Sequence, residues 1–141
     1  MSTHLPTLLS RVAHALDADL AAQLRWHGVS LVEFRVLMAL RDADPHGLPV
    51  TKLAERCLLQ QPTASKLLDR MERYEWAVRN IGRPDRRVVM ALATRQGLAL
   101  AERLCAIACE EEQRARKALP ALDFDGLRAV CAAYLGEKLG C

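Results

Sequence analysis

Aromatic residues and long apolar runs are both scarce in this chain of 141 residues. Phe, Trp and Tyr make up 4% of the sequence and apolar residues 51%, so the core must consist mainly of Leu, Ala and Val. No apolar run approaches the ~20 residues that a membrane-spanning helix needs. Residues 1–20 lack the basic start and the unbroken apolar stretch of a signal peptide. These absences predict one compact domain, or a domain with terminal extensions, that works in the cytoplasm without a membrane partner.

The chain also lacks the patterns of a disulfide framework, a metal site or an active site. Its five cysteines are an odd number, no CxxC motif occurs, and the four histidines form no helical ligand pair. No nucleotide-binding loop, nucleophile elbow or paired-carboxylate motif is present. We therefore expect no metal, no cofactor and no enzymatic activity.

Positive charge is concentrated in one part of the sequence. Residues 51–90 contain nine Lys/Arg and five Asp/Glu, a balance of +4, whereas the remainder contains eleven and twelve, a balance of −1. A local basic excess of this kind indicates a nucleic-acid partner more clearly than the net charge of +3 does.

The apolar spacing predicts helices at both ends of the chain and a small mixed module between them. Ser30 and Glu33 form a capping-box pattern, Pro62 suits the start of a helix, and Thr94 and Asp123 suit helix caps. The long helix should turn Leu98 inward. The expected elements are helices over 5–27, 31–40, a short one capped by Thr51, 62–73, 94–117 and 123–135, and strands over 77–81 and 88–92.

This order predicts a mainly α fold with a small β-hairpin wing. Two short helices joined by a tight turn form a helix-turn-helix, and the hairpin after them completes a winged helix-turn-helix DNA-binding lobe. We expect a dimerisation helix over 1–30, the DNA-binding lobe over 31–94, and a long helix with a C-terminal dimerisation helix over 95–141. The apolar stripes of the terminal helices are too large for the central module to cover, so a second copy of the chain should bury them.

Three segments of the sequence form a recognisable set: HGVSLVEFRVLMAL at 27–40, VTKLAERCLLQQPTASKLLDRMER at 50–73, and RPDRRVVMALATRQG at 83–97. Together they resemble the MarR family of bacterial transcription regulators. Glu75 departs from the pattern, because the family often has glycine after the recognition helix. The resemblance implies a homodimer that binds a pseudo-palindromic operator in double-stranded DNA, most often as a repressor. For a two-fold dimer the half-sites should lie roughly 34–36 Å apart.

The candidate DNA contacts lie on the recognition helix and the wing. The start of the helix normally meets base edges, where Gln suits adenine and Lys suits guanine, while arginines further along suit the backbone. Arginines at the wing tip suit a narrow minor groove, and the resemblance implies that Asp85 and Arg87 pair to brace it. Besides Arg79, which adds to the positive charge of the wing, the candidates are Gln61, Thr63, Ser65, Lys66, Arg70, Arg73, Arg83, Arg86 and Arg87.

The resemblance also implies an effector site between the dimerisation helices and the DNA-binding lobe. Many family members release DNA when a small molecule, often an aromatic acid, binds there. A guanidinium and an imidazole could hold its carboxylate, although each candidate taken singly is more often a structural residue. The candidates are Arg11, His14, Trp26, His27 and Arg35.

Two alternatives to an effector-controlled DNA-binding protein remain open. The first is a redox sensor, but peroxide-sensing members use a cysteine near the start of the first helix, and this chain has none before Cys57. Cys105 and Cys109 could share a helix face, although packing is the commoner role of such a pair, and Cys141 could be oxidised at the terminus. The second is a winged helix that binds protein, which would not need an arginine-rich tip.

Overall fold

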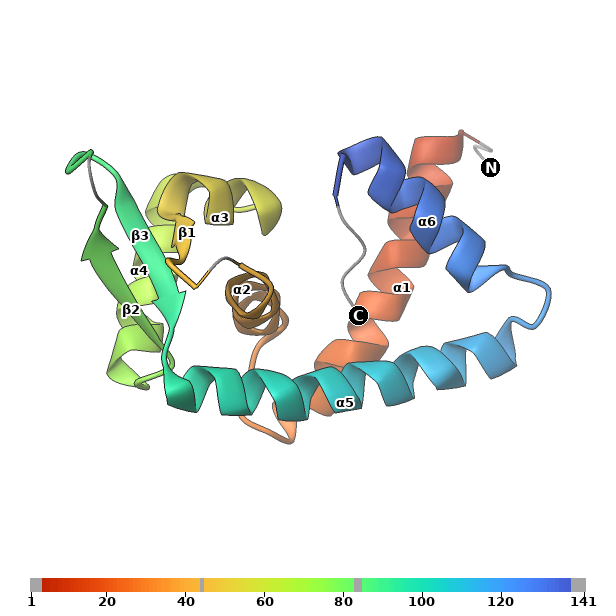
Figure 1. The fold of residues 1–141 in the computed structure, drawn as a ribbon. Helices are drawn as coiled ribbons and strands as arrows, with labels where there is room; N and C mark the ends of the chain where they lie inside the picture. Colours follow the sequence, from red (N-terminus) through yellow and green to blue (C-terminus); the bar gives the residue numbers. More distant parts are fainter. Residues whose placement is uncertain (1–3, 44, 83–84, 138–141) are drawn as a thin grey trace.

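The computed structural model of the protein describes residues 4–43, 45–82 and 85–137. Its long helix runs from a compact lobe, which contains the sheet, toward the part of the molecule that holds the first and last helices (Figure 1). Among these residues, no helix combines the length and apolarity needed to cross a bilayer. The elements are α1 (Leu5–Arg25), α2 (Leu31–Arg41), β1 (Leu48–Pro49), α3 (Val50–Arg56), α4 (Gln61–Arg73), β2 (Ala77–Ile81), β3 (Val89–Ala93), α5 (Arg95–Ala118) and α6 (Phe124–Leu135).

The sheet has three strands, whereas the sequence predicted only the β2–β3 hairpin. Strand β1 pairs with β3 in antiparallel register, so the strand order is β1-β3-β2. Its two residues end in Pro49, which lacks an N–H and is tolerated because β1 is an edge strand. The predicted cap at Thr51 is also wrong: α3 begins at Val50, and Pro49 occupies the capping position without a side-chain bond.

The other predicted caps are confirmed, and they fix where the helices begin. The Ser30 hydroxyl accepts from the Glu33 N–H at 3.1 Å, while Glu33 Oε2 accepts from the Ser30 N–H at 3.0 Å, a complete capping box. Thr94 and Asp123 each accept an N–H three residues later, both at 2.9 Å. These bonds satisfy N–H groups that have no partner within the helix.

The core is formed by inward side chains of the helices α1 to α5 together with those of β2 and β3. Its largest fully buried side chains are those of Leu24, Leu37, Leu53, Leu68, Met71, Leu104 and Val36. The predicted inward position of Leu98 is wrong, since this side chain is exposed and Gly97, Leu100, Ala101 and Leu104 form the buried stripe instead. Close contact between Gly97 and the backbone of Trp76 sets this rotation of α5.

Two residues of the helix-turn-helix module adopt left-handed backbone conformations without being glycine. Leu58 follows α3 with φ 57°, and Glu75 follows α4 with φ 61°. At the end of α4 the N–H of Trp76 donates to the Met71 carbonyl at 2.9 Å, and the N–H of Glu75 donates to the Glu72 carbonyl at 3.0 Å. This is a Schellman motif, in which glycine is the usual residue at the position that Glu75 occupies.

We expect Glu75→Gly to stabilise the protein. A side chain in the left-handed region costs about 1 kcal/mol, and only part of that gain is offset by the greater freedom of glycine in the unfolded chain. Urea unfolding should show a free energy of unfolding higher by up to about 0.6 kcal/mol. Glu102→Gly, an exposed site inside α5, is the matched control and should lose about 1 kcal/mol. A decrease for both variants would contradict this account of the α4 end.

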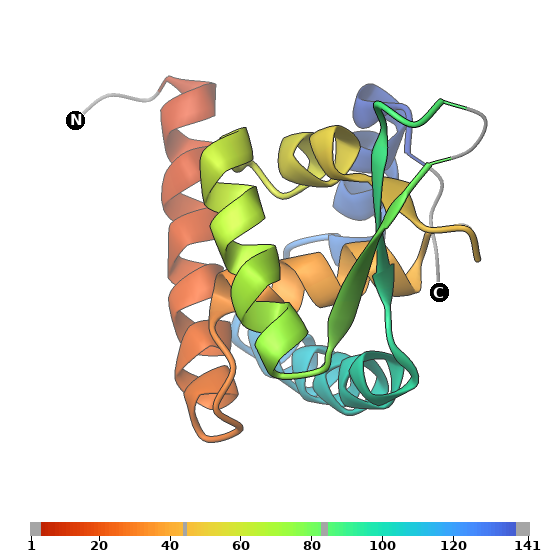
Figure 2. The same cartoon turned by 90° about the vertical axis from the view of Figure 1, so that its left-hand side faces the viewer.

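The outer helices carry apolar side chains that their own chain does not cover. On α1, Leu5, Leu9 and Val12 are exposed, and on α6, Val130 and Tyr134 are 68% and 90% exposed. The two helices overlap in Figure 1, but Figure 2 places α1 on the left and α6 on the right, behind the sheet. They therefore leave two separate apolar faces.

Candidate nucleic-acid interface

The start of α4 is exposed on its outer face, and the buried inner face anchors the helix in the core. Ala64, Leu67, Leu68 and Met71 are buried on its inner face, whereas Gln61, Thr63 and Lys66 are exposed. Figure 2 shows α4 and the β2–β3 hairpin side by side on the same face of the lobe, with the start of α4 and the outer end of the hairpin directed the same way. An anchored helix whose N-terminus projects in this way can enter a groove, and its free N–H groups favour phosphate.

Ser65 lies on the same helix but is half-buried, because Arg79 of β2 reaches across to it. Arg79 Nη1 donates to Ser65 Oγ at 3.2 Å, and Arg79 Nε donates to Glu72 Oε1 at 2.7 Å. A third bond joins Arg79 Nη2 to Asp69. The hydrogen bonds to Glu72 and Asp69 raise the pKa of Arg79. The sequence predicts that Arg79 adds to the positive charge of the wing, but two carboxylates of α4 neutralise it.

The two arginines near the end of α4 have different surroundings. Arg70 Nε donates to Glu33 Oε1 at 3.0 Å, and Glu33, which is 5% exposed, also caps α2. Arg73 is exposed in the last turn. The Glu33 contact links α2 to the recognition helix and occupies part of the Arg70 guanidinium, while Arg73 keeps an open approach for phosphate. The pairing escaped prediction because Glu33 is 37 residues distant in sequence and had been assigned only to the cap.

The wing contains the ion pair that the family resemblance implied. Arg87 Nε donates to Asp85 Oδ1 at 3.1 Å, and the Arg87 backbone N–H donates to the same oxygen at 3.0 Å. These bonds from Arg87 lower the pKa of Asp85. Arg86 between them is exposed and forms no ion pair within the described part of the chain. Arg83 lies outside the described residues. The wing thus presents Arg86 from a turn that Asp85 and Arg87 hold together.

The five candidate effector residues do not form a single site. Arg11 and His14 are exposed on α1, whereas Trp26 and His27 follow its last turn, and Trp26 is 87% exposed. Twelve residues of helix separate His14 from Trp26, which corresponds to ~18 Å. Arg35 of α2 donates to Asp17 of α1 at 2.6 Å, one helical turn after His14. Of the five candidates, only Arg35 is a charged residue whose ion pair joins two helices, α2 and α1.

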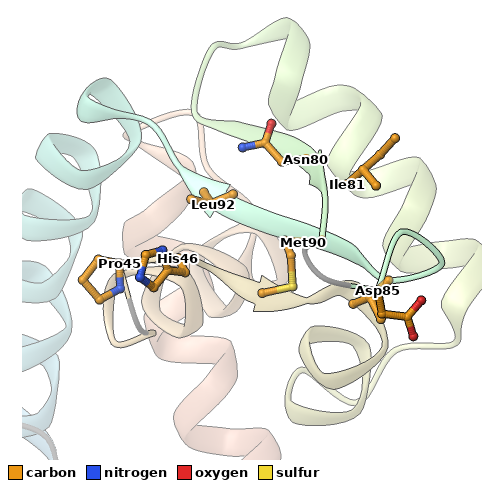
Figure 3. Close-up of a pocket in the computed structure, with 9 residues that line it drawn as sticks. Pro45, His46, Asn80, Ile81, Asp85, Met90 and Leu92 are labelled. Carbon is orange, nitrogen blue, oxygen red and sulfur yellow. The ribbon is translucent and has the colours of Figure 1, made fainter.

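Two cavities open on the surface, at places that the sequence did not indicate. One of about 400 Å³ lies beside the sheet (Figure 3). The residues around it include Met90 and Leu92 of β3, Asn80 of β2, and Pro45 and His46 of the loop before β1. The other, about 650 Å³, lies between α1 and α5 and has an acidic border of Asp17, Asp19, Glu111 and Glu112. The loop over 45–47 lies between α2 and β1.

Two of the described thiols, Cys57 and Cys109, have a raised pKa. Burial raises the pKa of the Cys57 thiol. Burial and the neighbouring Cys105 thiol raise the pKa of Cys109. Cys105 is half-buried, Cys131 is exposed, and Cys141 lies outside the described residues. Within the described ranges, no three His, Cys, Asp or Glu residues are grouped as a metal site.

We expect peroxide to leave DNA binding unchanged. The thiolate is the form that reacts, and a thiol with a pKa above its ordinary value of ~8.5 has less than about 3% thiolate at pH 7. DNA affinity should be equal before and after brief peroxide treatment. Labelling of Cys57 and Cys109 should still be accelerating as the pH passes about 8.5, where the labelling rate of an ordinary thiol begins to level off. Loss of binding that Cys105→Ser or Cys109→Ser prevents would contradict this expectation.

Comparison with known proteins agrees with this geometry. Residues 27–88 match the MarR family. A MarR family transcriptional regulator from Silicibacter pomeroyi DSS-3 has a solved structure that is 30% identical, with a TM-score of 0.78 over 95% of this chain and 94% of that one. CouR from Rhodococcus jostii RHA1, solved bound to p-coumaroyl-CoA, is 20% identical, with a TM-score of 0.80 over 99% of this chain and 96% of that one.

A curated relative provides a sequence match over a shorter range. The HTH-type transcriptional regulator MhqR of Bacillus subtilis is 27% identical over 93 residues, which are 66% of this chain and 63% of that protein. The matched segment is thus less than two thirds of the relative's length. The solved S. pomeroyi regulator, in contrast, corresponds to this chain over nearly its whole length. By sequence and by fold, this chain belongs to the MarR family of transcriptional regulators.

Proposed function

We propose that the protein is a homodimeric, sequence-specific DNA-binding repressor of transcription. The observation that carries this proposal is the common orientation of the α4 N-terminus and the wing on one face of the lobe (Figure 2). One element presents groups for base edges, and the other presents an exposed arginine. A major groove can accept the helix while the adjacent minor groove or backbone accepts the wing.

The proposed dimer is supported by the apolar faces of α1 and α6. Leu9 and Val12 of α1 and Val130, Tyr134 and Leu135 of α6 are exposed in the single chain. Apolar surface of this extent on two separate helices is typical of a protein–protein interface. Because α6 follows the long helix α5, a dimer formed through α6 sets the distance between the two copies of α4.

Within the proposed interface, base reading and backbone binding are divided along α4. Gln61, Thr63, Ser65 and Lys66 lie in its first half, where the helix would be deepest in the groove. Arg73, at the other end, suits phosphate, and Arg70 can contribute only as far as its bond to Glu33 permits. On the wing, Arg86 would contact DNA directly, and Arg83 and Arg87 would add positive charge.

Gln61→Ala should alter base preference. A bidentate contact between glutamine and adenine contributes about 1–3 kcal/mol of discrimination. We expect the ratio of affinities for operator and single-base variants to fall about tenfold at one position of each half-site. Competition binding with a set of labelled variants measures this ratio. If the ratios at all positions equal those of the wild type, Gln61 does not read a base.

We further propose that a small aromatic acid controls DNA binding from a site beside Arg35. Arg35 joins α2 to α1 through Asp17, so a ligand carboxylate that replaces Asp17 would alter the contact between the dimerisation helix and the lobe. The CouR structure, with its aromatic acyl thioester, provides a related precedent. Of the remaining candidates, His14 lies one turn of α1 before Asp17, whereas Trp26 and His27 follow the end of this helix and are distant from that contact.

A mobility shift on the intergenic DNA next to the gene tests both proposals. The wild-type chain should shift this DNA in preference to a scrambled duplex of equal length, and a panel of aromatic acids should include one that releases it. Arg35→Gln should reduce release without abolishing the shift. Equal binding to scrambled DNA would contradict sequence-specific binding, whereas specific binding that no acid releases would contradict only the effector proposal.

A further inference from the structure

Arg79 contacts three side chains along one face of the recognition helix. Its guanidinium donates to Glu72 at 2.7 Å, to Asp69, and to the Ser65 hydroxyl at 3.2 Å. The same Nη1 also approaches the Ser65 carbonyl at 3.5 Å. Spacings of four and three residues place these partners in one row on α4. A single side chain of the wing strand β2 is thus attached to more than one turn of the helix.

The two carboxylates in this row would oppose DNA binding if they were unpaired. Asp69 is exposed and Glu72 is half-buried, on the helix that we propose to lie in the major groove. Negative charge there would be repelled by phosphate. The guanidinium of Arg79 pairs with both carboxylates and offsets their repulsion of phosphate. Arg79 therefore favours DNA binding without contacting DNA itself.

The third partner, Ser65, has a hydroxyl whose hydrogen-bonding role this contact restricts. A serine hydroxyl has one donor and two acceptor positions, and serine inside a helix often donates to the carbonyl four residues earlier. Ser10 of α1 does so, to the Pro6 carbonyl at 2.9 Å. Ser65 makes no such bond among the residues that the structure describes. Its oxygen accepts from a cation, which leaves the O–H free and makes it a stronger donor.

We propose that Arg79 is a positioning residue that fixes Ser65 as a hydrogen-bond donor toward a base, and so determines specificity at one position of each half-site. This inference rests on the proposed DNA-binding function. Guanine, adenine and thymine present acceptor atoms in the major groove, whereas cytosine presents only its N4 donor. The base that faces Ser65 is therefore one of the first three, and cytosine is excluded.

The test measures relative affinities of the full chain for its operator and for symmetric single-base variants. The wild type should disfavour cytosine by roughly fivefold per half-site at one position, as expected for a single hydrogen bond. Ser65→Ala should abolish this preference. Arg79→Met should abolish the same preference and also weaken binding to every sequence. In the double variant Ser65→Ala/Arg79→Met the preference against cytosine should be no smaller than in Arg79→Met alone. Both changes remove the same hydrogen bond from Ser65 to the base.

Two controls separate positioning from a general defect. Asp69→Asn and Glu72→Gln, added to Arg79→Met, should restore general affinity without restoring the preference against cytosine. When Thr63→Ala is combined with Arg79→Met, the two decreases in DNA affinity should multiply. Thr63 lies on α4 outside the contacts that Arg79 makes. Thermal unfolding of each variant monitors the fold. If Arg79→Met does not fold, Arg79→Lys replaces it, because lysine keeps the charge but has no planar fork to reach three partners.

The possible results separate this inference from the function on which it rests. Wild-type protein without any base preference overturns both the proposed function and the inference. Base preference that Ser65→Ala leaves unchanged overturns the inference alone. The inference is also overturned if Ser65→Ala and Arg79→Met change the relative affinity at the same base position by factors that multiply in the double variant. Loss of the same single preference in both variants, without further loss in the double variant, supports it.

Discussion

Replacing Arg86 with alanine should weaken binding to all duplexes alike, by roughly 100-fold for the proposed dimer. Arg86 is exposed at the wing turn, and its neighbours Asp85 and Arg87 pair with each other. A hydrogen bond to a charged group contributes about 1.5–3 kcal/mol, and partial solvation at a wing favours the lower figure. Since 1.4 kcal/mol corresponds to a tenfold change in affinity, the loss of both copies of Arg86 in the dimer gives a decrease of roughly 100-fold.

The salt dependence of binding gives a second, independent signature of Arg86. Each phosphate that a protein neutralises contributes about 0.9 to the slope of log K against log salt. Arg86→Ala should therefore make this slope shallower by about 2 for the dimer, with the ranking of operator variants unchanged. Arg103→Ala, an exposed position on α5, provides the matched change of charge and should leave slope and affinity unaltered. Equal slopes for wild type and Arg86→Ala would exclude Arg86 from the interface.

Replacing Gly97 with alanine should destabilise the whole protein by about 3 kcal/mol, which lies at the upper end of overpacking effects. Gly97 is buried near the start of α5, and its N–H donates to Thr94. A Cβ at this position would lie closer than 3.0 Å to the backbone carbonyl of Trp76, which cannot move like a flexible side chain. Trp76 connects α4 to β2, so the strain would act at the joint between recognition helix and wing.

The sign of the Gly97 effect makes this prediction distinctive. Within a helix, glycine to alanine ordinarily stabilises by about 1 kcal/mol. Ala99→Gly, an exposed position two residues further along α5, should show this ordinary behaviour and lose about 1 kcal/mol. Chemical denaturation of both variants measures the difference. A more stable Gly97→Ala variant would mean that α5 packs on Trp76 less closely than the structure shows.

Local chemistry made much of the fold predictable. The capping box at Ser30, the caps at Thr94 and Asp123, and the helix and strand order depend on residues within a few positions of one another, and all are observed. The errors have tertiary causes. The third strand β1 exists only because β3 lies beside it. The rotation of α5 that exposes Leu98 depends on Trp76, which is 22 residues distant in sequence.

The candidate site was predictable to the same degree. The sequence indicated the exposed start of α4 and the Asp85–Arg87 pair, because both follow from local pattern and family resemblance. It did not indicate the partners of the other arginines. Arg70 with Glu33, Arg79 with Asp69 and Glu72, and Arg35 with Asp17 join different elements. Charge counting along the sequence overstates the free positive charge for this reason.

Selection of preferred sites from a pool of random duplex DNA tests the central claim most directly. A dimer that places two α4 helices in successive major grooves should enrich two half-sites related by two-fold symmetry, with centres about 10–10.5 base pairs apart. The protein should reject duplexes in which five base pairs are inserted between the half-sites, because the insertion rotates one half-site to the opposite face of the DNA. Enrichment of a single asymmetric site, or of half-sites at freely variable spacing, would contradict the proposed dimeric reading of DNA.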